Sequence, residues 1–146
     1  IQPVFVDLDM NTVEPAIGTY RMEGIYAWKT MLDLGIHASG GSDAPVVSFD
    51  AMENIYFAVT RKNINGEPKE GWIPSERLTV DDAVKLFTKY AAYASYTEDE
   101  NGTIEVGRNA DFVVLEKDIY EIDPDEIKTT KVDMTIPGGK TVFERK

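Results

Sequence analysis

The stretch of sequence that best indicates the fold is Ile36-His37-Ala38-Ser39-Gly40-Gly41-Ser42-Asp43-Ala44-Pro45. Its first seven residues are predicted as a short β-strand of small side chains, which are typical where neighbouring chain or a ligand approaches closely. Pro45 prevents the strand from continuing, so Asp43 should lie at its carboxyl end. Parallel α/β folds keep their chemistry at that edge.

The segments around this stretch have the rhythm of a parallel α/β sheet or barrel. Upstream, residues 1–6 (IQPVFV) predict a strand, and residues 20–33 predict a helix that ends before Gly35. Downstream, residues 50–61 predict a second helix with an apolar stripe. The order strand, helix, strand, helix favours the α/β class.

The second half of the chain predicts a loop, a third helix and then a small β unit. Residues 62–77 hold two glycines, two prolines and several charges, so we expect an exposed loop. A helix is predicted over residues 79–95, with Thr79 as its cap. A strand over 111–115 and a hairpin from 131–136 and 141–144 follow. We therefore divide the chain into residues 1–98 and 99–146.

Composition excludes several classes of function. The 146 residues include 15 basic and 26 acidic side chains, a net charge of −11 that disfavours nucleic acid and anionic lipid as partners. Cysteine is absent, which excludes disulfides and thiolate metal sites and makes the cytoplasm the expected location. No apolar run approaches the roughly 20 residues that a membrane helix needs.

The chemistry of Asp43 is open on motif logic alone. A carboxylate at a strand end can bind a metal or accept a proton from metal-bound water, and it can equally be a turn aspartate that caps local amides. His37, the only histidine, would lie about 20 Å away along an extended strand, too far to be a co-ligand, so we interpret it as structural. Asp7 and Asp9 could meet Asp43 in an all-oxygen site for magnesium or calcium. No triad is predicted, because Ser39 and Ser42 lack a nearby base.

Two separated segments resemble the same family. Residues 41–45 (GSDAP) are similar to the strand-eight motif of the amidohydrolase superfamily, and are most similar to its amidohydrolase-3 branch. Residues 102–115 (GTIEVGRNADFVVL) resemble the stretch where that family's chain leaves its barrel and re-enters a small β-sandwich domain. Further matches in the right order are Gln2-Pro3, Glu76-Arg77-Leu78-Thr79, Tyr90-Ala91-Ala92-Tyr93-Ala94 and Gly138-Gly139-Lys140.

The resemblance implies the last two β/α units of a TIM-type (β/α)₈ barrel, followed by the C-terminal half of a small β-sandwich domain. It implies that Asp43 ligates a divalent metal, usually zinc, and shuttles a proton in the hydrolysis of amide-like bonds of a small-molecule substrate. Ser42, Ala44 and Pro45 would contact that substrate, and Phe49, Tyr20 and Trp72 are further candidates to line its pocket.

The family's remaining ligands, a His-x-His pair and further histidines, would precede Ile1. We therefore expect a C-terminal fragment that is inactive and binds no metal by itself, and in which His37 would point into the lower barrel of the intact enzyme. Its exposed strand edges would be covered by the missing N-terminal part or by self-association. The alternative is a stand-alone, non-catalytic binding or oligomerisation module that keeps the scaffold.

Overall fold

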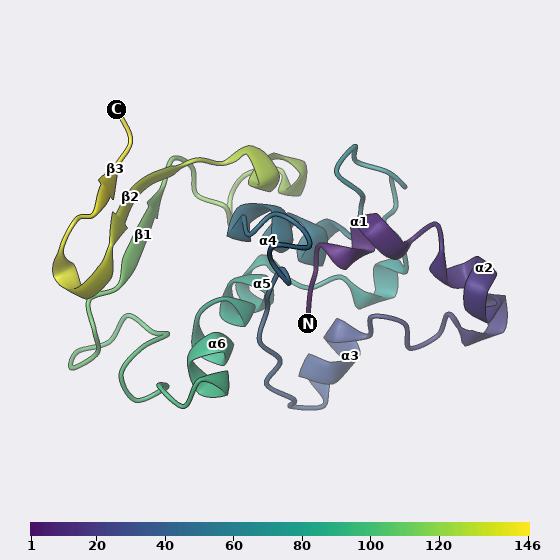
Figure 1. Cartoon of the computed structure of the whole chain (residues 1–146), viewed down its shortest axis with the longest axis horizontal. Helices are drawn as coiled ribbons and strands as arrows, with labels where there is room; N and C mark the ends of the chain where they lie inside the picture. Colours follow the sequence, from purple (N-terminus) through teal and green to yellow (C-terminus); the bar gives the residue numbers. More distant parts are fainter.

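All 146 residues are described by the computed structural model, in which a helical body carries a small antiparallel sheet at one end (Figure 1). The α-helices are α1 (Phe5–Asp9), α2 (Val13–Ile17), α3 (Trp28–Asp33), α4 (Ala51–Thr60), α5 (Val80–Leu86) and α6 (Lys89–Ala94). The 3₁₀ turns are η1 (Thr19–Arg21), η2 (Pro74–Glu76), η3 (Pro124–Thr129) and η4 (Pro137–Gly139), and the strands are β1 (Phe112–Leu115), β2 (Val132–Ile136) and β3 (Phe143–Glu144).

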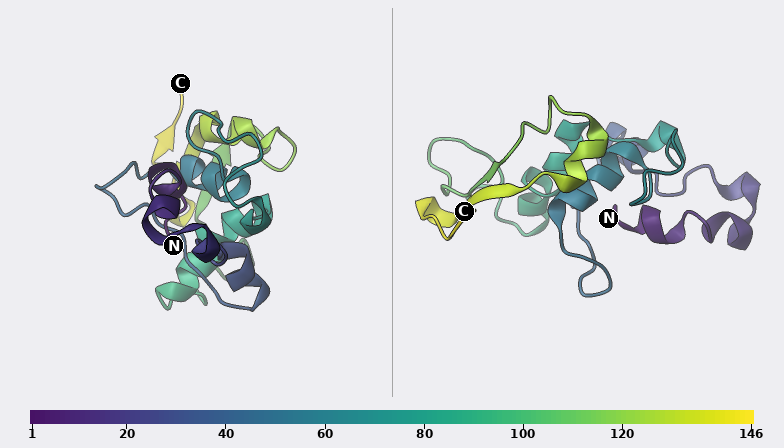
Figure 2. Two further views of the ribbon diagram at one scale, coloured as in Figure 1. Left: turned by 90° about the vertical axis from the view of Figure 1, so that its right-hand side faces the viewer. Right: turned by 90° about the horizontal axis from the view of Figure 1, so that it is seen from above.

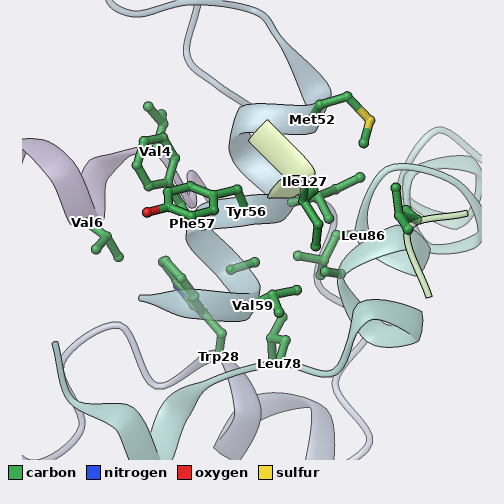
Figure 3. Close-up of a cluster of buried hydrophobic side chains, with 14 of the residues drawn as sticks. Val4, Val6, Trp28, Met52, Tyr56, Phe57, Val59, Leu78, Leu86 and Ile127 are labelled. Atoms are coloured by element: carbon green, nitrogen blue, oxygen red, sulfur yellow. The ribbon is translucent and has the colours of Figure 1, made fainter. Parts of the chain in front are cut away.

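Helix α4 is the centre of the core, and it confirms the helix predicted over residues 50–61. It begins at Asp50, whose side-chain oxygen accepts a hydrogen bond from the Met52 backbone N–H at 2.8 Å. Its buried side chains meet those of the neighbouring helices and of η3, as Tyr56, Phe57 and Ile127 show in Figure 3. The helix ends at Arg61, which adopts the left-handed conformation with φ of 56°.

The strand predicted over residues 1–6 is wrong, because the chain turns into α1 at Phe5. The N–H groups of Phe5 and Val6 donate to the carbonyls of Gln2 and Pro3 at 3.1 Å. Pro3 favours this turn, since its fixed φ suits the start of a helix and its missing N–H is not needed there. Val6 is then fully buried against the core.

The strand predicted over residues 36–42 is extended chain without a regular ladder. It forms one pair of hydrogen bonds of the parallel type: the Ile1 amino group donates to the Ser39 carbonyl, and the Gly41 N–H donates to the Ile1 carbonyl, both at 2.8 Å. The chain turns away after Ile1, so this pairing cannot extend. No parallel sheet forms, and the small antiparallel sheet supplies the β part of the α/β class.

Two predicted helices are shorter or divided. Only the last part of residues 20–33 becomes helix α3, because Gly24 and Tyr26 have φ of 88° and 48° and interrupt the turn pattern. Residues 79–95 divide into α5 and α6 around Thr88, whose φ of −127° and ψ of −94° are not helical. The predicted cap is confirmed, since the Thr79 hydroxyl accepts a hydrogen bond from the Asp82 N–H at 3.0 Å.

The β unit matches its prediction. Strands β1, β2 and β3 pair antiparallel in that order, with Val113 opposite Thr135 and Thr135 opposite Phe143. Gly138 and Gly139 turn the chain between β2 and β3 with φ of 55° and 75°. The outer edge of β1 has no partner strand. None of the helices has the length and apolar character required to cross a membrane.

Candidate functional site

Asp43 lies on an exposed loop between the extended segment and α4. This loop, residues 41–49, stands out from the helices in both views of Figure 2. Asp43 has a left-handed backbone with φ of 59°, and its carbonyl accepts a hydrogen bond from the Val46 N–H at 2.9 Å. Ser42 is half-buried, and Ala44 and Pro45 are exposed. The four residues predicted as a site are consecutive, and Asp43, Ala44 and Pro45 lie in the turn that this hydrogen bond closes.

The loop rises from a fixed base. Ala38 is buried, and the Gly40 N–H donates to the Leu86 carbonyl of α5 at 2.9 Å. Gly40 lies against the Phe87 ring so closely that an added Cβ would be 2.6 Å from the ring Cζ, which explains why the sequence has glycine there. The turn that carries Asp43 thus begins three residues after a position that is locked against the helical body.

The carboxylate of Asp43 accepts no hydrogen bond from another residue, and its carbonyl, rather than its carboxylate, closes the local turn. The turn-cap interpretation of Asp43 therefore does not describe this structure. A free, exposed carboxylate is available to a metal ion, a water molecule or a substrate.

The structure does not bring Asp7 and Asp9 to Asp43. The Asp7 carboxylate accepts a hydrogen bond from the Ile64 N–H at 2.7 Å, and the Asp9 carboxylate accepts one from the Tyr26 hydroxyl. No three histidine, aspartate or glutamate side chains come close enough to hold a metal ion. The all-oxygen site considered from the sequence is therefore not formed, and the donors of this chain do not by themselves fit a metal centre.

His37 is exposed and lies against two tyrosines of α6. Its ring stacks on Tyr90 with centroids 5.1 Å apart and meets the edge of Tyr93 at 4.8 Å. These contacts hold the extended segment against α6.

Sequence reasoning missed a cluster at the end of α4 in which the buried Arg61 side chain contacts carbonyl groups and aromatic rings. The Arg61 guanidinium donates to the carbonyls of Trp72 and Tyr26 at 2.7 and 2.9 Å, and it lies 4.7 Å from the Trp28 ring. Burial lowers the pKa of Arg61 to about 10, against the opposite influence of Glu76. The only sequence signal is an arginine where a helix commonly ends in glycine. Trp72, considered as a pocket residue, belongs to this cluster instead.

An apolar cleft of about 1260 Å³ separates the helices α4–α6 from the sheet. Its walls include Met52 and Phe87 on the helical side and Phe112 and Ile136 on the sheet side. Residues 41–49 do not line it. The cleft is therefore separate from the turn that carries Asp43.

Comparison with known proteins gives one consistent result. The model of the amidohydrolase family matches residues 1–143. The chain is 37% identical over 145 residues to the Bacillus subtilis protein YtcJ, which is named as an amidohydrolase; the match covers 99% of this chain and 27% of that protein. It is 32% identical over 121 residues to N-substituted formamide deformylase of Arthrobacter pascens, covering 83% of this chain and 22% of the enzyme.

A solved structure supports the same fold. A metal-dependent hydrolase of Pyrococcus horikoshii superposes with a TM-score of 0.73 at 21% identity, covering 85% of this chain and 25% of that one. The chain spans about a quarter of the length of the proteins that it matches.

Proposed function

The chain belongs to the amidohydrolase family, and we propose that it is the C-terminal part of a metal-dependent hydrolase that cleaves amide-like C–N bonds with water. The observation that carries this proposal is the free carboxylate of Asp43, held on a turn above a fixed base within a chain that matches the family from residue 1 to residue 143. The relative named as a formamide deformylase supports the bond class.

Asp43 supplies a carboxylate with two roles in this proposal. It would contribute one ligand to a divalent metal, zinc by the resemblance, which would activate the attacking water, and it would hold the proton that leaves this water. The water oxygen bonds to the carbonyl carbon, the C–N bond breaks, and Asp43 returns the proton to the leaving nitrogen, which gives an acid and an amine. Ala44 and Pro45 lie in the same turn as Asp43 and Ser42 precedes it, and all three would contact the substrate.

The donor set of this chain is too small for a zinc site, which requires three or four ligands. His37 is engaged with tyrosine rings, and the carboxylates of Asp7 and Asp9 already accept hydrogen bonds from other residues. We therefore propose that the remaining ligands lie outside residues 1–146 and that the isolated chain does not turn over substrate.

The test compares two aspartates seven positions apart in the complete enzyme that contains this segment. Asp43→Asn should lose at least about a hundredfold in kcat and lower the metal content, because it removes a ligand and a proton carrier. Asp50→Asn is the matched control: it makes the same charge change but keeps the helix cap, so its activity should stay within about threefold of wild type. Full activity and metal content in Asp43→Asn would contradict the proposal.

The isolated chain gives a second measurement. Metal analysis of purified residues 1–146, with an assay on simple amides, should find no stoichiometric metal and no turnover. Tightly bound metal together with turnover would refute the assignment of the remaining ligands to other parts of the protein.

The second candidate function is a stand-alone module that binds a partner or another copy of itself. It is favoured by the unpaired edge of β1, where Val113 and Val114 are exposed. This candidate predicts a stable dimer of residues 1–146 at micromolar concentration, measured by light scattering. A monomer at that concentration would exclude self-association through this edge.

A further inference from the structure

We propose that Asn65 is a site of spontaneous deamidation, whereas the packing of the chain protects Asn101 from the same reaction. These two asparagines are the ones that precede a glycine in the sequence. A glycine has no Cβ to hinder its backbone nitrogen, so Asn-Gly is the pair in which this reaction is fastest. The inference is independent of the proposed hydrolase function, because the reaction needs only water.

The reaction joins the side chain of the asparagine to the backbone of the next residue. The backbone nitrogen of Gly66 attacks Asn65 Cγ, a new N–C bond forms, and the bond from Cγ to the side-chain nitrogen breaks. Ammonia leaves and takes with it the proton that Gly66 loses. Water then opens the succinimide ring at one of its two carbonyl carbons, which gives aspartate or isoaspartate. Each event adds one negative charge to the chain.

Asn65 lies in an exposed turn between α4 and η2. Its side chain is exposed, and its amide group forms no hydrogen bond within the chain. A Cβ added to Gly66 would meet no atom within 4 Å beyond its chain neighbours, so the space beside the attacking nitrogen is open. The Gly66 N–H donates to the Asn63 carbonyl at 2.9 Å, and this bond must break during the reaction. Because the turn is exposed, water can replace the bond.

Asn101 has the opposite surroundings. Its side-chain oxygen accepts a hydrogen bond from the Asn109 side-chain amide at 2.7 Å. A Cβ added to Gly102 would be 2.7 Å from the Ala92 Cβ and 3.0 Å from the Thr88 carbonyl oxygen, so the backbone at Gly102 lies directly against α6. Attack on Asn101 requires the Gly102 nitrogen to move away from this contact. Deamidation there therefore has to wait for the segment to open locally.

Deamidation of Asn65 would affect a turn that joins two distant parts of the chain. The N–H of Ile64 donates to the Asp7 carboxylate of α1 at 2.7 Å, and the Ile64 carbonyl accepts a hydrogen bond from Lys128 of η3 at 2.7 Å. Isoaspartate inserts a side-chain carbon into the backbone at the next residue. Both products also place a new carboxylate one residue from the position that binds Asp7, and like charges repel. These changes weaken the attachment of the turn to α1.

The test incubates the complete protein that contains this segment in mildly alkaline buffer and follows both sites by mass spectrometry of tryptic peptides. Cleavage after lysine and arginine places Asn65 in residues 63–69 and Asn101 in residues 90–108. In the folded protein, aspartate and isoaspartate should appear first at Asn65. The rate at Asn101 should be at least about tenfold lower, because that site must first open.

Two controls separate the effect of packing from the effect of sequence. In urea that unfolds the protein, the two rates should agree within about threefold, since the fold no longer protects Asn101. Asn65→Gln should abolish the early product and leave the rate at Asn101 unchanged. Equal rates at the two sites in the folded protein would overturn the proposal, and so would an Asn65 that reacts only in urea.

The effect on α1 is measured on the deamidated protein, which ion exchange separates by its added negative charge. The Ile64 amide proton should exchange with solvent faster than in the unmodified protein, because its hydrogen bond to Asp7 is weakened. An unchanged exchange rate would show that the turn keeps its attachment to α1, and it would overturn this second step.

Discussion

Replacing Arg61 tests whether one buried guanidinium holds the helical body together. Its side chain is fully buried, joins the carbonyls of Tyr26 and Trp72, and lies over the ring faces of Trp28 and Trp72 at 4.7 and 5.4 Å. In Arg61→Ala both carbonyls lose their charged donor, and the space of a large side chain is left between two indole rings. The loop after α4 and the segment before α3 then keep the direct contact of the Trp72 and Tyr26 rings but lose the hydrogen bonds that join both to Arg61.

The magnitude follows from these contacts. Hydrogen bonds from a charged donor contribute about 1.5 kcal/mol each at the low end of their range, and cation–π contacts in a desolvated place contribute about 1 kcal/mol or more. Release of the ordered side chain returns up to about 2 kcal/mol of conformational entropy. We expect Arg61→Ala to lower the free energy of unfolding by about 2 to 3 kcal/mol.

The backbone supplies an internal control. Arg61 has φ of 56°, a left-handed conformation that costs a residue with a Cβ about 1 to 2 kcal/mol and costs glycine almost nothing. Arg61→Gly loses the same contacts as Arg61→Ala but relieves this strain, so it should be about 1 kcal/mol more stable than the alanine variant. Arg61→Lys keeps the charge but cannot bridge both carbonyls, and it should fall between alanine and wild type.

The assay is equilibrium unfolding in urea followed by tryptophan fluorescence, which is well placed because both tryptophans of the chain contact Arg61. A loss below about 0.5 kcal/mol in Arg61→Ala, within the range of ordinary surface substitutions, would refute the role of the guanidinium. A glycine variant no more stable than the alanine variant would refute the reasoning about the backbone.

Three further predictions concern other fixed points. Burial and the hydrogen bond to Asp9 raise the pKa of Tyr26 to about 12. The folded state therefore keeps a proton that the unfolded state releases above pH 10. The stability that this group contributes is lost as the pH rises from 10 to 12. The lowered pKa of Arg61 has the opposite effect on stability over the same pH range. The contribution of Tyr26 is therefore measured as the difference in unfolding free energy between wild type and Tyr26→Phe. This variant should not show the loss of stability between pH 10 and 12. Asp50→Ala should cost about 1 kcal/mol in urea unfolding and Asp50→Asn little, since only alanine removes the cap of α4. Gly40→Ala should destabilise by about 1 to 3 kcal/mol through contact with the Phe87 ring, and a double-mutant cycle with Phe87→Leu should recover part of that loss.

Features with local determinants could be predicted from the sequence. Helix α4 is preceded by Asp50, and α5 by Thr79, and each side chain forms the expected cap with a backbone N–H inside the helix. The turn between β2 and β3 needs positive φ at two positions, and glycines occupy both. In each case a few neighbouring residues decide the structure, so a pattern of spacing is sufficient.

The structure of residues 1–6 and 36–42 could not be predicted correctly from the sequence. A parallel strand depends on neighbours that are far away in sequence. Ile1 makes its pair of hydrogen bonds with the extended segment, and then Pro3 favours a helical turn. The turn is stabilised by distant side chains: the Val4 N–H donates to the Asn54 side chain of α4 at 3.1 Å. Tertiary contact with α4 thus decides a segment whose composition is that of a strand.

The residues that stabilise the fold differ from the residues that are proposed to contact a substrate. The core gathers around α4, and the buried Glu76 accepts hydrogen bonds from the backbone N–H and the hydroxyl of Thr30 within the chain. The carboxylate of Asp43 accepts no such hydrogen bond, although a charged group has much to gain from a partner. A sequence pattern can locate Asp43, but the structure gives its carboxylate no partner that would fix its chemistry. Substitutions at Asp43 should therefore have little effect on folding, whereas those at Arg61 should change the stability of the folded state.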